Sequence, residues 1–204
     1  MSGPLRQRLF PVRRRRADGQ TVPLWRAVAL MSVFSMWTLA GCEAGHGNSS
    51  VIGTVAPDFT LQDAQEEDGS PPVTLTRLVE SGSVVIVFHR GLHCPICTLH
   101  LLEISEHMAD FTRAGVQGVA IGPDTPAEAR INLDTVGPLS MPLLSDPGDK
   151  TARAFGLESA SHGLQHGTFV VDRSRRIQFA GISDEPVGTV PELLDAARRA
   201  GGSH

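Results

Sequence analysis

Residues 84–88 (VVIVF) form a short, unbroken apolar run in which most side chains are β-branched. Such a run predicts a strand that is buried on both faces of its sheet. Gly91 and Pro95 follow, and a proline suits the first position of a helix. The chain is therefore expected to pass from a fully buried strand directly into a helix.

The helix that begins at Pro95 has one apolar face. Its apolar side chains recur at spacings of 4, 3, 4 and 3 positions: Cys97, Leu101, Ile104, Met108 and Phe111. Side chains at these spacings share one side of a helix. We predict one long helix that ends at Gly115.

Strands and helices alternate along the rest of the chain. The patterns predict strands over residues 116–121, 141–144, 168–171 and 176–182, and helices from Pro126, over 151–155 and from Pro191 to Arg199. A tight polar turn over residues 172–175 makes the last two strands a hairpin. We therefore expect an α/β protein with a central mixed β-sheet flanked by helices, in three α/β/α layers.

The first 41 residues have the order of a secretory signal peptide. A basic block precedes an apolar run, and small residues follow before Cys42. The 14 residues between Arg26 and Gly41 are few for a spanning helix, which needs roughly 20. Leu39-Ala40-Gly41-Cys42 resembles the lipobox of bacterial lipoproteins, in which the cysteine receives a diacylglycerol and becomes the new N-terminus. A plain signal anchor with an incidental cysteine is the alternative.

These features divide the chain into three parts. We predict a lipoprotein signal peptide over residues 1–41, a flexible Gly- and Ser-containing tether over 42–50, and a folded domain over 51–204. The protein is then expected in the cell envelope of a bacterium, attached to a membrane through the lipid and facing the periplasm or the exterior.

The charge of the chain is unevenly distributed. Seven of its 18 basic residues but only one of its 22 acidic residues precede Cys42, which leaves 11 basic and 21 acidic residues from there on. An acidic body is unsuited to binding a phosphate backbone, so nucleic acid is not an expected partner.

Cys94 and Cys97 occupy the junction between the buried strand and the helix. With Pro95 at the first helical position, both sulfurs lie near free backbone N–H groups and the positive end of the helix dipole. That environment lowers the pKa of a thiol, and the thiolate is the reactive form. His89, Arg90 and His93 are candidates for further positive charge.

Three other interpretations of the cysteine pair remain open. In an oxidising compartment the pair can be a structural disulfide. His93, Cys94, Cys97 and His100, joined by His166, offer soft ligands for a structural zinc or for copper. We expect no metal and no cofactor, and we expect His100 and His107 to be ordinary helix-surface residues.

Four segments resemble the peroxiredoxin-like (AhpC/TSA, or redoxin) branch of the thioredoxin-like superfamily. They are residues 53–61 (GTVAPDFTL), 88–97 (FHRGLHCPIC), 142–146 (PLLSD) and 167–172 (GTFVVD). The resemblance covers about residues 51–199. It implies a thioredoxin-like fold and cysteine-based redox chemistry.

The active-site segment departs from the family's pattern at several positions. Peroxiredoxins carry a proline, a threonine and the peroxidatic cysteine in one short motif. Here Arg90 takes the proline's place, Cys94 the threonine's and Cys97 the peroxidatic cysteine's. His166 stands where family members carry an arginine, and it falls in a loop expected to face the site.

The resemblance implies a peroxiredoxin-like antioxidant peroxidase that reduces hydroperoxides through a Cys94–Cys97 redox disulfide. Cys97 would attack the peroxide and Cys94 would resolve it, with Arg90 holding the thiolate and His93 and His166 on the substrate side. An external dithiol would reduce the disulfide. The alternatives are a thiol-disulfide oxidoreductase acting on protein disulfides, with Cys94 attacking first, and a copper chaperone on the same fold.

Overall fold

The computed structural model describes residues 50–161 and 163–201. The predicted signal peptide, Cys42 and all of the predicted tether except Ser50 lie outside the described residues. Within the described part, no helix combines the length and the apolar character that crossing a membrane requires.

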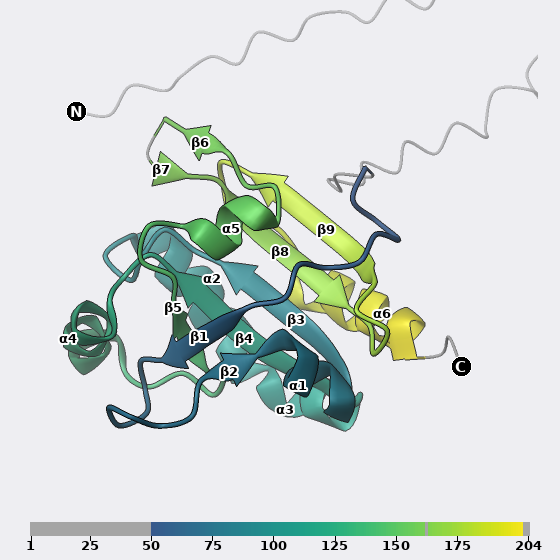
Figure 1. The fold of residues 1–204 in the computed structure, drawn as a ribbon, viewed down its shortest axis with the longest axis horizontal. Coiled ribbons are helices and arrows are strands. Elements are labelled where there is room, and N and C mark those ends of the chain that lie inside the picture. Colours follow the sequence, from purple (N-terminus) through teal and green to yellow (C-terminus); the bar gives the residue numbers. More distant parts are fainter. Residues whose placement is uncertain (1–49, 162, 202–204) are drawn as a thin grey trace, which may run out of the picture. The chain divides into compact units, whose positions relative to one another are not determined.

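A seven-stranded mixed sheet forms the centre of the fold (Figure 1). Its strand order is β2-β1-β5-β4-β3-β8-β9, in which β3 pairs parallel with β4 and antiparallel with β8. A separate two-stranded ribbon pairs β6 with β7. The strands are β1 (Thr60–Asp63), β2 (Val73–Thr74), β3 (Ser83–Phe88), β4 (Val116–Gly122), β5 (Leu143–Ser145), β6 (Ser159–Ala160), β7 (Gly163–Leu164), β8 (His166–Val171) and β9 (Ile177–Ser183).

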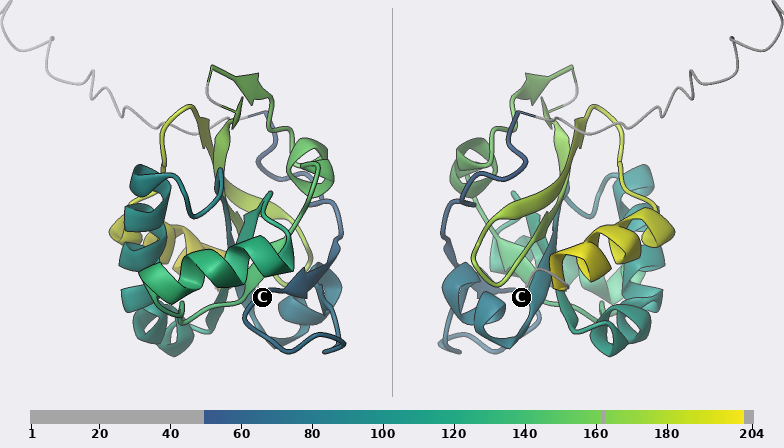
Figure 2. Two further views of the ribbon diagram at one scale, coloured as in Figure 1. Left: turned by 90° about the vertical axis from the view of Figure 1, so that its left-hand side faces the viewer. Right: turned by 90° about the vertical axis from the view of Figure 1, so that its right-hand side faces the viewer.

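Helices cover both faces of this sheet (Figure 2). They are α1 (Leu75–Ser81), α2 (Pro95–Glu106), α3 (Met108–Arg113), α4 (Pro126–Val136), α5 (Lys150–Ala154) and α6 (Val190–Gly201). All six residues of β3 are buried, and the five apolar ones alternate between two apolar clusters. Val85 and Val87 pack with residues of α2, α3 and α6, whereas Ile86 and Phe88 pack with residues of α1 and α5. This alternation confirms the three-layer α/β/α fold with a central mixed sheet.

The predicted long helix after Pro95 is wrong in one respect, because it is two helices that meet at His107. The apolar face is as expected, since every member of the predicted stripe is buried. The His107 ring donates a hydrogen bond from Nδ1 to the Glu103 carbonyl at 2.9 Å. In a continuous helix that carbonyl would accept from the His107 backbone N–H, which instead bonds to Ile104. At His107 the ring, rather than the backbone N–H, bonds the Glu103 carbonyl.

The remaining differences concern short elements. The strand predicted over residues 141–144 begins two residues later, at Leu143. No element was predicted before residue 84, yet β1, β2 and α1 lie there. Thr74 is the N-cap of α1, and its hydroxyl accepts a hydrogen bond from the Arg77 backbone N–H. His166, expected in a loop, is the first residue of β8.

Candidate active site

The two cysteines lie at the junction between β3 and α2. Cys94 is the N-cap of α2, with an extended backbone (φ −89°, ψ 110°), and Pro95 is the first helical residue. The Cys94 carbonyl accepts the first helical hydrogen bond, from the Thr98 N–H at 3.0 Å. Cys97 is therefore the third helical residue. This local geometry agrees with the sequence prediction, and it places both sulfurs at the positive end of the helix dipole.

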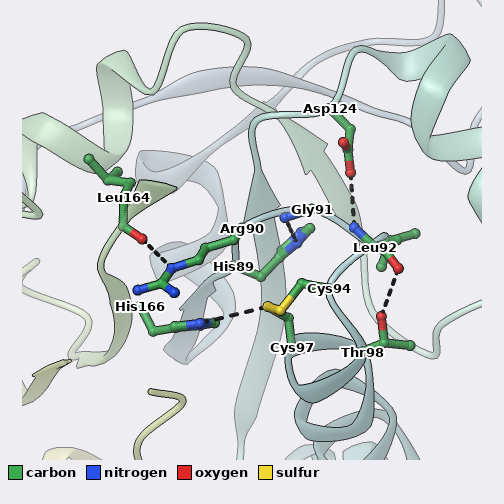
Figure 3. Close-up of a disulfide and its surroundings, with 10 residues drawn as sticks. All are labelled: His89, Arg90, Gly91, Leu92, Cys94, Cys97, Thr98, Asp124, Leu164 and His166. Carbon is green, nitrogen blue, oxygen red and sulfur yellow. Dashed lines mark hydrogen bonds between the residues drawn. A yellow bond between two sulfur atoms is a disulfide. The ribbon is translucent and has the colours of Figure 1, made fainter. Parts of the chain in front are cut away.

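Cys94 and Cys97 are joined by a disulfide, with their Cα atoms 5.3 Å apart (Figure 3). Their environments differ. Cys97 is 1% exposed and packs on the core side of α2, whereas Cys94 is half-buried. Cys94 is therefore the more accessible of the two to a partner molecule, and Cys97 is enclosed by the fold.

His166 approaches the inner sulfur from the neighbouring strand. Its Nε2 atom lies 3.7 Å from the Cys97 Sγ, and the residue is 3% exposed. The β3–β8 register pairs Phe88 with Gly167, which sets His166 beside the end of β3. Burial, together with the positive charge of Arg90, lowers the pKa of His166 to about 4. The imidazole is consequently neutral at neutral pH and can donate one N–H.

Arg90 lies beside His166 in the close-up view (Figure 3). Its Nε donates to the carbonyl of Leu164 at 2.5 Å, which ties the site to β7. Its Nη2 is 4.0 Å from the Asp184 carboxylate, but that side chain is 63% exposed, so the pair is weak. The same Nη2 is buried and has no hydrogen-bond partner among the described residues. Arg90 thus brings a fixed cation and an unused donor to the site.

His89 does not add positive charge to the site. It is fully buried, and burial lowers its pKa to about 4, so the ring is neutral. Its Nδ1 accepts a hydrogen bond from the Gly91 backbone N–H at 3.0 Å. His93 is exposed, and its ring lies against Gly91, whose φ of +102° favours glycine. Neither histidine hydrogen-bonds the sulfurs. Of the three residues expected to supply positive charge near the cysteines, Arg90 therefore fits the prediction best.

A second group of residues holds the loop before Cys94, and the sequence analysis missed it. The carboxylate of Asp124 accepts from the Leu92 backbone N–H at 3.1 Å, and the Thr98 hydroxyl donates to the Leu92 carbonyl at 3.0 Å. Ser145 donates its hydroxyl to the Asp124 carbonyl at 2.6 Å. Asp124 follows β4, which runs parallel to β3, so both strands end at the same edge of the sheet. The position of Asp124 just after a strand parallel to β3 was the sequence signal that could have identified this residue.

Three possible metal ligands meet at the disulfide. The Sγ atoms of Cys94 and Cys97 and a ring nitrogen of His166 lie within 4.8 Å of one another. Of the histidines considered from sequence, His166 is in this group, whereas His93 and His100 are placed elsewhere. His93 is exposed, and the Nε2 of His100 hydrogen-bonds the Gly188 carbonyl at 3.1 Å. The structure therefore brings together both cysteines, Arg90 and His166 but leaves His93 at the surface.

Comparison with known proteins gives consistent results. The model of the AhpC/TSA family matches residues 52–180. Alkyl hydroperoxide reductase E of Mycobacterium tuberculosis is 33% identical over 132 residues, which are 63% of this chain and 83% of the relative. The chloroplastic peroxiredoxin Q of Gentiana triflora is 30% identical over 129 residues, covering 62% of this chain and 57% of that protein.

A solved structure shares the fold. The crystal structure of peroxidoxin BcpB from Mycobacterium tuberculosis superposes with a TM-score of 0.63 at 23% identity. The match covers 72% of this chain and 96% of that one.

Proposed function

The chain belongs to the AhpC/TSA family, and from this premise we propose that it reduces hydroperoxides, with Cys97 as the attacking sulfur and Cys94 as the resolving one. The observation that carries the assignment is the setting of Cys97. Its sulfur is buried at the start of a helix, 3.7 Å from a neutral imidazole, and a second cysteine lies within bonding distance.

The first step takes place in the reduced form, where the Cys97 Sγ is a thiolate rather than a disulfide sulfur. The thiolate attacks one oxygen of the hydroperoxide ROOH, an S–O bond forms and the O–O bond breaks. The leaving oxygen takes a proton and departs as ROH, and Cys97 is left as a sulfenic acid. The His166 N–H stabilises the thiolate, and the free Nη2 donor of Arg90 holds the peroxide oxygen.

The second step uses the neighbouring cysteine. The thiol of Cys94 attacks the sulfenic acid of Cys97, the disulfide forms and water leaves. The product of this step is a Cys94–Cys97 disulfide, the bond that the structure contains. An external dithiol then reduces it and is itself oxidised to a disulfide. The half-buried Cys94 is the sulfur that such a reductant reaches first.

Thiol-disulfide exchange is a second candidate, favoured by the surface around Cys94. Ile96 and Leu99 are large apolar side chains on the same helix, and they are 53% and 67% exposed. A protein disulfide could dock on them and be attacked at Cys94, with Cys97 releasing the partner. In that case Cys94, not Cys97, is the nucleophile.

We also propose that the protein is exported and attached to a bacterial membrane through a lipid on Cys42. The support is the order of basic, apolar and small residues before Cys42. The peroxidase would then act in the cell envelope, facing the periplasm or the exterior.

One experiment separates the two chemistries. The full chain carrying Cys42→Ser and Cys94→Ser is reduced and mixed with one equivalent of hydrogen peroxide, and the mass of the Cys97 peptide is followed over time. Sulfenic acid that appears at Cys97 far faster than on free cysteine supports the peroxidase. The matched Cys42→Ser, Cys97→Ser chain should react no faster than free cysteine. If the second variant, mixed with a protein disulfide, instead traps a mixed disulfide at Cys94, and Cys97 of the first variant stays inert to peroxide, exchange is the function.

A further inference from the structure

The site joins two soft ligands and one imidazole from separate parts of the fold. Cys94 and Cys97 are fixed by the first turn of α2, and His166 is fixed by the pairing of β8 with β3. The three ligand atoms lie within 4.8 Å of one another, and the Nε2 of His166 is the atom that faces the Cys97 sulfur. Small side-chain rotations would bring all three to one ion once the disulfide is reduced.

We propose that the reduced chain binds one cuprous ion through the sulfurs of Cys94 and Cys97 and the Nε2 of His166. Thiolate and imidazole are the donors that copper and zinc accept in proteins, and soft thiolates select cuprous copper in particular. Cys97 and His166 are almost wholly buried, so two of the three ligands are shielded from water.

The charge beside the ligands distinguishes cuprous copper from zinc. Two thiolates and a cuprous ion carry one net negative charge, which the buried guanidinium of Arg90 balances. With a zinc ion the two thiolates are already neutralised, and the cation of Arg90 keeps only its weak pairing with the exposed Asp184 carboxylate, 4.0 Å away. A buried charge is more favourable with a close counter-charge than without one. Arg90 therefore favours the singly charged ion.

The number of ligands points the same way. The histidines near the site have other partners or point away, because His89 accepts from the Gly91 N–H, His100 bonds the Gly188 carbonyl, and His93 is exposed. Structural zinc sites are closed by four protein ligands. Within residues 50–161 and 163–201, the group that meets here supplies three. A cuprous ion accepts a trigonal set, so this group is complete for copper and incomplete for structural zinc.

Binding requires reduced sulfurs but no turnover. The ion binds both sulfurs as thiolates, so a proton still held by either cysteine is released, and no electron is transferred. The disulfide has no thiolate to offer, so oxidation and copper compete for the same atoms. Copper binding needs no reaction with peroxide, so the two proposals are tested separately and either can fail without the other.

The test is a titration of the full chain carrying Cys42→Ser, which removes the third thiol. The reduced protein is titrated without oxygen against the coloured complex of cuprous ion with bathocuproine disulfonate. We expect one copper per chain, and an X-ray absorption spectrum with two sulfur ligands and one imidazole nitrogen. The same chain in its disulfide form should take no copper from the chelator.

Three variants assign the ligands. His166→Leu should weaken copper binding at least about tenfold, equal to ~1.4 kcal/mol, and should remove nitrogen from the spectrum. His93→Ala and His107→Ala, at exposed histidines, are the matched controls and should bind as the parent does. Loss of nitrogen in His93→Ala, a sulfur-only spectrum of the parent, half a copper per chain, or zinc displacing cuprous copper would each overturn the proposal. The spectrum of the parent decides the question even where a variant does not fold.

Discussion

The Nε2 atom of His166 lies 3.7 Å from the Cys97 Sγ, although the two residues are 69 positions apart. One comes from the start of a strand and the other from the first turn of a helix. A neutral ring N–H at this distance can stabilise a thiolate without adding charge to the site. This contact governs the first prediction.

Replacing His166 by Leu should slow the reaction of Cys97 with peroxide about tenfold at pH 7. A hydrogen bond to a charged group contributes ~1.5–3 kcal/mol, and its loss disfavours the thiolate. The acid limb of the pH–rate profile, measured by stopped-flow in a Cys94→Ser background, should move to higher pH. His107→Ala, at an exposed histidine, should leave the profile in place. An unmoved profile for His166→Leu would remove His166 from the mechanism.

Arg90→Met should lower the rate of the same reaction by a similar factor, because the donor and the cation are both lost. Arg90→Lys keeps the charge but loses the planar guanidinium that reaches Leu164. Its rate should therefore lie between that of the parent and that of Arg90→Met. Arg153→Met changes an exposed arginine and is the control. Equal rates for all three variants would contradict the role of Arg90.

The fold should lose stability as the pH falls from about 6.5 to 4. The folded chain holds His89 neutral with a pKa of about 4, whereas the unfolded chain binds a proton near its ordinary value of 6.5. The unfolded state thus binds more protons within this window, and stability falls with falling pH. Below pH 4 both states are protonated and the contribution of His89 is constant. The loss due to His89 is roughly 3 kcal/mol at about 1.4 kcal/mol per pH unit.

Urea denaturation followed by circular dichroism measures this effect, since the chain has no tyrosine and its tryptophans, Trp25 and Trp37, precede the described residues. His89→Asn should reduce the difference in unfolding free energy between pH 7 and pH 4. His166 titrates in the same direction and remains in both proteins. An identical pH dependence in the variant would show that His89 is not the titrating group.

Gly122→Ala should destabilise the domain by several kcal/mol or prevent folding. Gly122 ends β4, and a β-carbon added there would overlap the ring of His89, which is buried and cannot move aside. Gly201→Ala, in a helix with open space around the added carbon, should change stability by less than about 0.5 kcal/mol. The thermal unfolding midpoints of the two variants are compared with that of the parent. A midpoint shift of Gly122→Ala as small as that of Gly201→Ala would contradict the predicted overlap.

Cys42→Ser should release the protein from the membrane if Cys42 carries the lipid. Expressed in a bacterium, the parent should sediment with membranes and incorporate labelled palmitate, and the variant should do neither. Cys94→Ser, which changes a different thiol, should behave as the parent. A Cys42→Ser protein that still sediments with membranes and shows an uncleaved leader would identify a signal anchor instead.

The local part of this structure could be predicted from sequence. The apolar run 84–88 forms β3, and Pro95 opens α2, because both signals depend on neighbouring residues alone. The placement of Cys94 at the N-cap followed from the same proline. The hairpin of β8 and β9 was likewise marked by its polar turn.

The long-range part of the structure could not be predicted from sequence. That His166 belongs to a strand and meets Cys97 depends on the register of β8 against β3, which no local pattern encodes. Asp124 reaches the Leu92 N–H only because β3 and β4 are parallel and end together. In both cases tertiary contacts decided what propensity left open. The break at His107 is local, and the hydrogen bond from its ring to the Glu103 carbonyl is a side-chain contact that apolar periodicity does not encode.

The cysteines are three positions apart in the chain, whereas the imidazole arrives only with the pairing of β8 and β3. Contacts between near neighbours form early in folding, and strand pairings over long separations form late. If the chain is exported to an oxidising compartment as proposed, a newly made molecule can therefore close its disulfide before His166 is in place. Such a molecule completes its fold in the oxidised form, and its first encounter with a reductant is then a step of maturation as well as of turnover.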